Sequence, residues 1–159
     1  MSHGQEWVLL AYRLPRMPST PRSAVWRKLK RLGVGWLGDG LVALPADPGT
    51  REQLEWIAEE VTDNGGEATL WLGRPLDSGA AASIKDRMGA AVAAEYDLVT
   101  SEAEAARDAD PAVRRRAVTR LRRELHRIQD RDFFNCPQRD MARRAVENLA
   151  AARPAEVRT

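Results

Sequence analysis

The sequence predicts an α+β fold in which one sheet carries two helices on one face and a helical segment follows. Four short apolar segments typical of strands lie before Pro75, two amphipathic helical patterns lie between them, and every pattern after Pro75 is helical. This β-α-β-β-α-β order is that of a ferredoxin-like sandwich. We therefore expect a ferredoxin-like domain over residues 7–75, a helical C-terminal extension packed on it over residues 76–152, and a frayed tail over residues 153–159.

The predicted strands are short apolar runs bounded by turn residues. The first run, Trp7–Tyr12, is followed by two X-Pro pairs, which end it. Val34–Leu37 and Leu41–Leu44 flank Gly38-Asp39-Gly40 and predict a β-hairpin. The run Ala68–Leu72 predicts the last strand.

The two helices of the sheet half have recognisable starts. Thr20 followed by Pro21 is typical of an N-cap and a first helical position, and Gly33 ends that helix. Thr50 and Gln53 have the spacing of a capping box for the second helix. The stripes predicted to face the sheet are Val25, Leu29 and Leu32 on the first helix, and Leu54, Ile57, Ala58 and Val61 on the second.

Four helices are predicted in the C-terminal segment. The first begins at Ser78, a short second at the capping-box pair Ser101 and Glu104, a long third at Asp110-Pro111, and the last follows a break at residues 132–137. The predicted apolar stripes are Ile84, Met88 and Ala91 on the first, Val118, Leu121, Leu125 and Ile128 on the third, and Met141, Ala145 and Leu149 on the last.

Charged residues are segregated along the chain, although the formal net charge is only +2. Residues 1–38 carry seven basic residues against one acidic residue, residues 39–110 carry five against sixteen, and residues 111–159 carry thirteen against six. Residues 7–38 contain no acidic residue at all. This basic window predicts a polyanionic partner for the N-terminal part of the chain.

Several function classes are excluded by composition. No apolar run approaches the roughly 20 residues that span a bilayer, and the N-terminus lacks the order of a signal peptide, so we expect a cytoplasmic protein. A single cysteine, Cys136, and two histidines, His3 and His126, do not make an ordinary zinc site. Because no catalytic triad, phosphate-binding glycine loop or Cys-x-x-Cys motif is present, we expect no catalytic residue, metal or cofactor.

The main candidate site is the basic cluster at residues 13–31. Helical steps of about 100° place Arg27, Lys30 and Arg31 away from the sheet-facing stripe, with Lys28 on a flank. Such a surface attracts phosphate backbones by releasing counterions. A merely solvated face, or neutralisation by the acidic second helix, is the alternative. The predicted nucleic-acid-binding residues are Arg13, Arg16, Arg22, Trp26, Arg27, Lys28, Lys30 and Arg31.

A second basic set lies on the long helix of the C-terminal segment. Arg116, Arg120, Arg123 and Arg127 follow one another at steps of three and four residues and form a candidate oxyanion-binding row. We favour the alternative that this row pairs with the acidic middle of the chain.

The tryptophans and the single cysteine have structural interpretations as well as functional ones. We expect all five tryptophans to pack between the sheet and the helices, with base stacking by Trp26 as the alternative. Cys136 has Arg131 and Arg139 nearby, and basic neighbours favour a reactive thiolate. An unreactive thiol is the simpler expectation.

Four separated segments of the chain form an ordered set of motifs: Leu14–Gly33, Asp39–Pro45, Gly65–Trp71 and Arg131–Phe134. Together they resemble the chromate-resistance regulator family, over residues 7–150. The resemblance implies transcriptional control of chromate efflux, DNA as a partner, and chromate or a related oxyanion as a further ligand. The resemblance also implies a second, C-terminal domain in the full-length form of the family, which we expect to begin beyond the part of the family that this chain resembles.

The segment Trp26–Gly33 also resembles the middle domain of phenylacetate-degradation repressors. That domain is similar in fold to the small ferredoxin-like nucleases of CRISPR systems, which dimerise through sheet edges, so the resemblance implies a homodimer. In those nucleases the first strand ends with a metal-binding Asp. Tyr12-Arg13-Leu14 stands at that place here, and because an arginine cannot ligate Mg²⁺, the departure argues against hydrolysis.

These observations favour a non-enzymatic DNA-binding transcriptional regulator of the chromate-resistance type. An oxyanion-binding or redox accessory protein without DNA binding is the first alternative. A metal-dependent nuclease relative is the second, and a homodimeric scaffold without a small ligand is the third.

Overall fold

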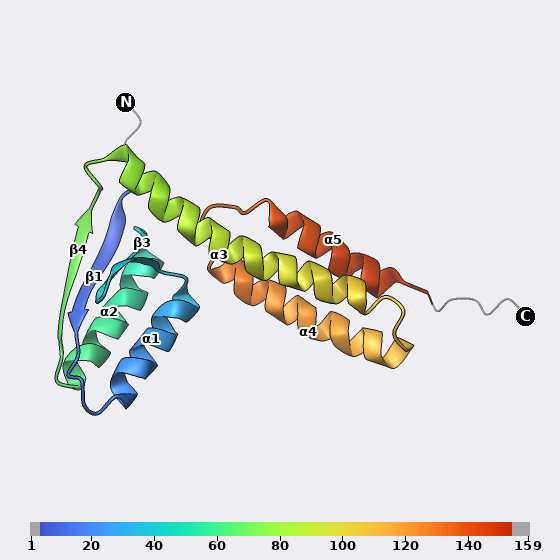
Figure 1. Ribbon diagram of the computed structural model, residues 1–159, viewed down its shortest axis with the longest axis horizontal. Coiled ribbons are helices and arrows are strands. Elements are labelled where there is room, and N and C mark those ends of the chain that lie inside the picture. The colour runs from blue at the N-terminus through green and yellow to red at the C-terminus, as the bar shows by residue number, and fades with distance from the viewer. Residues whose placement is uncertain (1–3, 154–159) are drawn as a thin grey trace, which may run out of the picture. The chain divides into compact units, whose positions relative to one another are not determined.

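The computed structural model describes residues 4–153, which form a mixed α and β structure with a four-stranded antiparallel sheet and five helices (Figure 1). The strands are β1 (Trp7–Arg13), β2 (Gly35–Gly38), β3 (Leu41–Pro45) and β4 (Glu67–Gly73). The helices are α1 (Thr20–Leu32), α2 (Pro48–Asp63), α3 (Ser78–Ala105), α4 (Pro111–Asp130) and α5 (Gln138–Ala151).

The chain divides into two compact units, Met1–Met88 (unit 1) and Gly89–Thr159 (unit 2), so that α3 contributes to both. This division falls within α3, beyond the boundary expected near residue 75. The packing of residues 76–152 on the sheet half stays a prediction. Most of the tail expected to fray, from residue 154 onward, lies outside the described residues.

Unit 1 is built on a sheet with the strand order β2-β3-β1-β4, in which every neighbouring pair is antiparallel. In the central strand, Leu10 lies opposite Val42 of β3 and Leu70 of β4. Helices α1 and α2 lie side by side on one face of the sheet (Figure 1). The main buried residues of this layer are Val8, Leu10, Val25, Leu29, Val42, Leu44, Leu54, Ile57 and Val61.

The burial of α1 and α2 confirms most of the predicted stripes. Val25 and Leu29 are fully buried on α1, whereas Leu32 is only half-buried near the end of the helix. On α2, Ala58 is likewise half-buried, at the border of an otherwise buried stripe. The apolar spacing therefore identified the face of each helix that meets the sheet.

The predicted N-caps of α1 and α2 are wrong by one and three residues, whereas the predicted start of α4 at Asp110-Pro111 is confirmed. The capping box of α2 is formed by Asp47 and Thr50: the Asp47 carboxylate accepts from the Thr50 N–H at 2.8 Å, and Thr50 Oγ1 accepts from the Asp47 N–H at 3.1 Å. Thr50 is therefore the third helical residue, because Pro48 takes the first position. On α1 the N-cap is Ser19, one residue before Thr20, and its side chain makes no capping bond.

Unit 2 has its own core between the C-terminal part of α3 and helices α4 and α5. The predicted stripe of α4 is confirmed at all four positions. The core consists of Val92, Tyr96, Val99, Ala103, Val118, Leu121, Leu125, Ile128, Ala142, Val146 and Leu149.

The prediction of a separate short helix at Ser101 is wrong. The capping-box pair Ser101 and Glu104 does not start a helix but lies inside α3, because Val99 and Ala103 continue its buried stripe through this region. An N-cap stabilises a helix start by about 1 kcal/mol, which is less than the free energy gained by burying these apolar side chains in the core.

The buried faces of α3 and α5 are also shifted from prediction. Val92 is buried in place of Ala91, four residues after Met88 rather than three. On α5, Ala142 and Val146 are buried, whereas Met141 is exposed. In each helix the buried residues keep a spacing of three or four, but the residue next to the predicted one faces the core. The predicted burial of Leu149 is confirmed.

A partly buried hydrogen-bond network joins α3 to the segment before α5. Tyr96 is fully buried, and its hydroxyl donates to Asp132 Oδ2 at 3.0 Å. The Cys136 N–H donates to Asp132 Oδ1 at 3.0 Å. Burial and this carboxylate raise the pKa of Tyr96.

We expect Asp132→Ala to destabilise the protein more than Tyr96→Phe. Asp132→Ala leaves two donors without their acceptor and should cost about 1–3 kcal/mol, whereas Tyr96→Phe removes one bond worth about 1 kcal/mol. Denaturant unfolding of both variants measures the difference. A Tyr96→Phe variant that loses as much stability as Asp132→Ala would contradict the shared-acceptor role of Asp132.

Candidate nucleic-acid interface

An open groove of about 790 Å³ lies in unit 1 between α1, the end of β1 and the β2–β3 hairpin. Three of its lining side chains are arginines and three are aromatic. The arginines are Arg13, Arg22 and Arg27, and the aromatic residues are Tyr12, Trp26 and Trp36. Asp39 contributes a carboxylate to the same groove.

The hairpin side of the groove is held by backbone contacts. The Tyr12 N–H donates to the Gly40 carbonyl oxygen at 2.8 Å. Gly40 has a φ of 79°, and a Cβ at this position would collide with the Tyr12 carbonyl oxygen, so the turn requires glycine. Arg87 Nη1 donates to the Trp36 carbonyl oxygen at 3.1 Å. These contacts fix Asp39 and Trp36 beside the end of β1.

The helix side of the groove follows from the burial of Val25 and Leu29 against the sheet. Steps of about 100° per residue put Arg22 and Trp26 on one flank of that buried stripe and Lys28 on the other. The first flank lines the groove. On the second flank, Lys28 Nζ lies 2.5 Å from Glu60 Oε2 of α2.

The predicted neutralisation by the acidic helix is therefore confirmed for Lys28. Within residues 4–153 no other member of the basic cluster makes an ion pair with a carboxylate. Arg16 and Arg31 are exposed and lie outside the groove. The side chains that keep their charge unpaired thus lie on the outer surface of α1, its approach loop and the groove.

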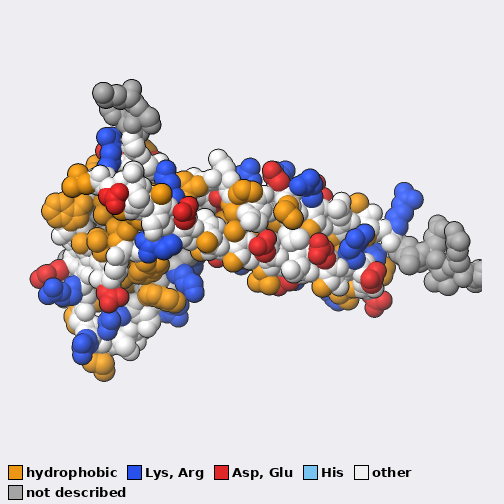
Figure 2. Space-filling view, turned by 45° about the horizontal axis from the view of Figure 1, so that its top comes forward, with side chains coloured by type: hydrophobic (Ala, Val, Ile, Leu, Met, Phe, Trp, Pro, Cys, Tyr) orange, Lys and Arg blue, Asp and Glu red, His pale blue; other side chains and the backbone are white. Residues whose placement is uncertain are grey.

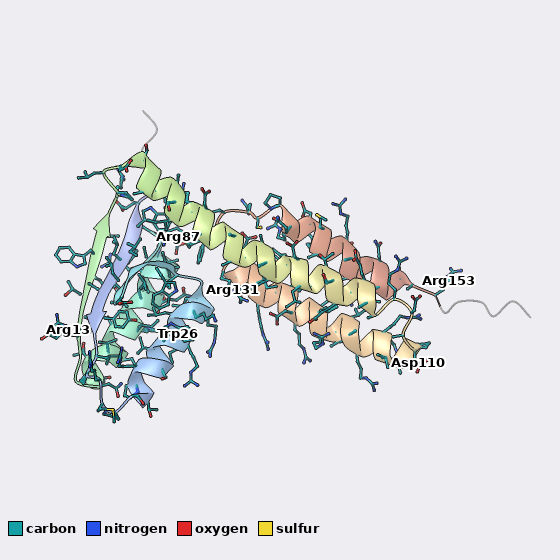
Figure 3. The ribbon with its side chains drawn as sticks, in the orientation of Figure 1. Arg13, Trp26, Arg87, Asp110, Arg131 and Arg153 are labelled. Atoms are coloured by element: carbon teal, nitrogen blue, oxygen red, sulfur yellow. The ribbon has the colours of Figure 1, made fainter. Side chains whose placement is uncertain are left out.

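Trp26 is exposed rather than packed under the sheet. Its side chain is 48% exposed, and Lys30 Nζ lies 4.9 Å from the centroid of its ring, a cation–π contact. Figure 3 places Trp26 on α1 and Arg13 at the end of β1. The two residues therefore contribute to the groove from different elements.

The prediction that all five tryptophans pack between sheet and helices is wrong for three of them. Trp7 is buried, but Trp26, Trp56 and Trp71 are 48%, 64% and 59% exposed. Trp26 and Trp56 lie next to the buried stripes, and one helical step of about 100° is enough to turn them outward. Figure 2 shows apolar and basic side chains intermixed on the surface of unit 1.

The electrostatics of the groove are mixed. Burial raises the pKa of Tyr12, Arg22 lowers it, and Asp39 raises it further, with a net increase. Arg22 and Asp39 therefore both act on the Tyr12 hydroxyl. The basic window is free of acidic residues along the sequence, but the hairpin brings Asp39 next to it in space.

Sequence reasoning identified part of this groove. Arg13, Arg22, Trp26 and Arg27 were predicted and line it. Tyr12, Trp36 and Asp39 were not predicted as site residues. The one usable signal was the Gly-Asp-Gly turn, whose acidic residue follows directly on the basic window.

The second basic set lies on α4. Arg116, Arg120, Arg123 and Arg127 line one open depression along this helix. Arg120 Nη1 lies 2.8 Å from Glu102 Oε2 of α3, which confirms pairing with the acidic middle segment for that residue. Arg127 pairs with Glu124 of its own helix at 3.7 Å. Oxyanion binding by the row stays a prediction.

Cys136 is half-buried, and its thiol donates to Gln138 Oε1 at 2.9 Å. Its predicted basic neighbour Arg131 instead donates from Nε to Glu95 Oε2 at 2.9 Å. The thiol environment is therefore less basic than the sequence suggested.

Within residues 4–153, no three His, Cys, Asp or Glu side chains gather in a way that could hold a metal ion. In the same part of the chain, every helix is too short or too polar to cross a membrane.

Comparison with known proteins gives two matches. The family model described as "Protein ChrB, N-terminal" matches residues 22–110. A curated relative, Protein ChrB of Cupriavidus metallidurans, is 32% identical over 138 residues, which cover 80% of this chain and 40% of the relative. The chain thus spans less than half the length of that relative. No solved structure matches the chain.

Proposed function

Because the chain belongs to the ChrB N-terminal family, we propose that it is a non-enzymatic, cytoplasmic, DNA-binding transcriptional regulator of the chromate-resistance type. The observation that carries the proposal is the basic surface of α1 and its groove. There, arginines from β1 and α1 converge without carboxylate partners among the described residues.

The electrostatic argument rests on unpaired cations. Arg22 and Arg27 line the groove, and Arg31 is exposed on the outer side of the same helix. Each arginine that reaches a phosphate releases condensed counterions, and this release drives binding to DNA. Carboxylates paired with these cations would reduce the free energy gained from counterion release. Within residues 4–153, Lys28 is the one member of the cluster that pairs with a carboxylate.

The fold and the end of β1 support a binding role over hydrolysis. We infer that unit 1 is of the ferredoxin-like type, because its element order and its strand order β2-β3-β1-β4 agree with that topology. The last residue of β1 is Arg13, a cation that repels rather than binds Mg²⁺.

A mobility-shift titration of the full chain with duplex DNA tests this function. We expect a retarded complex at low ionic strength that dissociates as salt is added. The absence of any complex at low ionic strength would contradict DNA binding.

We also propose that the regulator is a homodimer that pairs through β4. This strand is at an edge of the sheet, and its residues 68–73 carry no charge. Trp71 and Leu72 are 59% and 56% exposed there. Natural edge strands are usually protected by charges, bulges or covering segments, so an uncharged apolar edge is suited to pair with a second copy. Such a pair would also present two copies of α1 to two half-sites.

Trp71→Lys is expected to convert the dimer to a monomer, because it places a charge at the centre of the paired edge. Light scattering coupled to size exclusion measures the mass. Trp56→Lys is the matched control, since Trp56 is equally exposed but lies on α2, and it should leave the dimer intact. A monomeric wild type, or a Trp71→Lys variant that keeps the dimer mass, would refute pairing through β4.

A further inference from the structure

We propose that the groove between α1 and the β2–β3 hairpin binds unpaired nucleotides of DNA, with bases stacked on its aromatic side chains and phosphates at its arginines. This inference rests on the proposed DNA-binding function and adds a substrate class to it. A duplex backbone can be held by arginines alone, so the inference depends on what else lines the groove.

The aromatic side chains are the first observation. Tyr12, Trp26 and Trp36 come from a strand, a helix and a hairpin and converge on one groove. Proteins that hold single strands combine a positively charged groove with aromatic side chains on which bases stack. In an intact duplex the base faces are covered by their neighbours and are not offered to such side chains.

Trp26 is the side chain best placed for stacking. It is nearly half exposed although it lines the groove. The Lys30 ammonium lies over its ring and covers one of the two faces. A cation on one face of the ring leaves the other face for a base.

Asp39 is the second observation, because a carboxylate in the groove favours a ligand that offers bases over one that offers only phosphates. A carboxylate repels phosphate groups, so it weakens a groove that holds only a backbone. It accepts hydrogen bonds from the amino groups of cytosine, adenine and guanine. Within residues 4–153 Asp39 makes no ion pair with the arginines of the groove, so its oxygens are not held by them.

The geometry of the groove also fits an extended ligand. Arg13 lies at the end of β1 (Figure 3), while Arg22 and Arg27 are on α1, so the cations that line the groove come from two elements. A single strand presents its phosphates at intervals along its length. A groove of about 790 Å³ that is open to solvent admits such a strand from the side.

Fluorescence anisotropy with the full chain tests the inference. The labelled probes are a single-stranded oligonucleotide, the perfect duplex of the same sequence, and that duplex with a single-stranded overhang. Unlabelled deoxynucleoside monophosphate serves as a competitor. We expect the overhang duplex to bind more tightly than the perfect duplex, and the free nucleotide to compete poorly.

The variants assign the effect to the groove. Trp26→Ala should weaken binding of the single strand and of the overhang by about fivefold or more, and it should leave the perfect duplex almost unchanged. Trp26→Phe should keep most of the affinity because it keeps a ring. Trp56→Ala, which removes an exposed tryptophan outside the groove, should have no effect.

The outcomes separate the two proposals. If the duplex binds and Trp26→Ala changes the affinity for no probe, or changes it equally for all probes, the nucleotide site is overturned. The proposed regulator function then still stands. Competition by free mononucleotide as strong as that by the oligonucleotide also overturns it, because the ligand is then a small molecule. Binding of single strands without any binding of duplex supports the groove and contradicts the duplex-reading regulator.

Discussion

Arg27→Ala combined with Arg31→Ala is expected to weaken duplex binding and to flatten its salt dependence. The two residues are one helical turn apart on the outer side of α1, and both are exposed. Each phosphate contact contributes about −0.9 to the slope of log K against log salt concentration, so losing two contacts should reduce the magnitude of the slope by about 1.8. Titrations of wild type and variant at several salt concentrations measure both quantities.

The control for this prediction is Arg143→Ala with Arg144→Ala. These residues are exposed on α5, and their removal changes the net charge by the same amount. A loss that depends only on net charge would appear in both double variants. An unchanged slope in the α1 variant, or an equal loss in the α5 variant, would refute α1 as the phosphate-binding surface.

Leu29→Ala is expected to cost about 2–5 kcal/mol of unfolding free energy, because it removes a fully buried side chain and leaves a cavity between α1 and the sheet. Denaturant unfolding followed by circular dichroism measures the loss. The variant should also bind DNA less tightly, since Leu29 anchors the helix that carries Arg22 and Trp26.

Leu76→Ala is the matched control for Leu29→Ala. Leu76 also lies in unit 1, but its side chain is fully exposed. Its removal should change the stability by less than about 0.5 kcal/mol. If the two substitutions cost the same, Leu29 is not the anchor of α1.

The elements that the sequence predicts best are those with long, regular apolar spacing. All four residues predicted on the buried face of α4 are in the core, because a twenty-residue amphipathic helix has one face on which to bury them. The Gly-Asp-Gly turn likewise predicted the hairpin, since the left-handed φ of Gly40 is a local requirement.

The features that the sequence does not predict are decided by tertiary contacts. Ser101 and Glu104 have good capping spacing, yet burial of Val99 and Ala103 carries α3 through them. The groove depends on the hairpin packing against the end of β1, which brings Asp39 to Tyr12 across a gap in sequence. Local patterns therefore identified the cations of α1 but not the acidic and aromatic residues that face them.

The most direct test of the central claim is the salt dependence of duplex DNA binding by the wild-type chain. Contacts from Arg22, Arg27 and Arg31 predict a slope of log K against log salt concentration of about −2.7 or steeper. A slope near zero would contradict a regulator that holds DNA through the basic surface of α1.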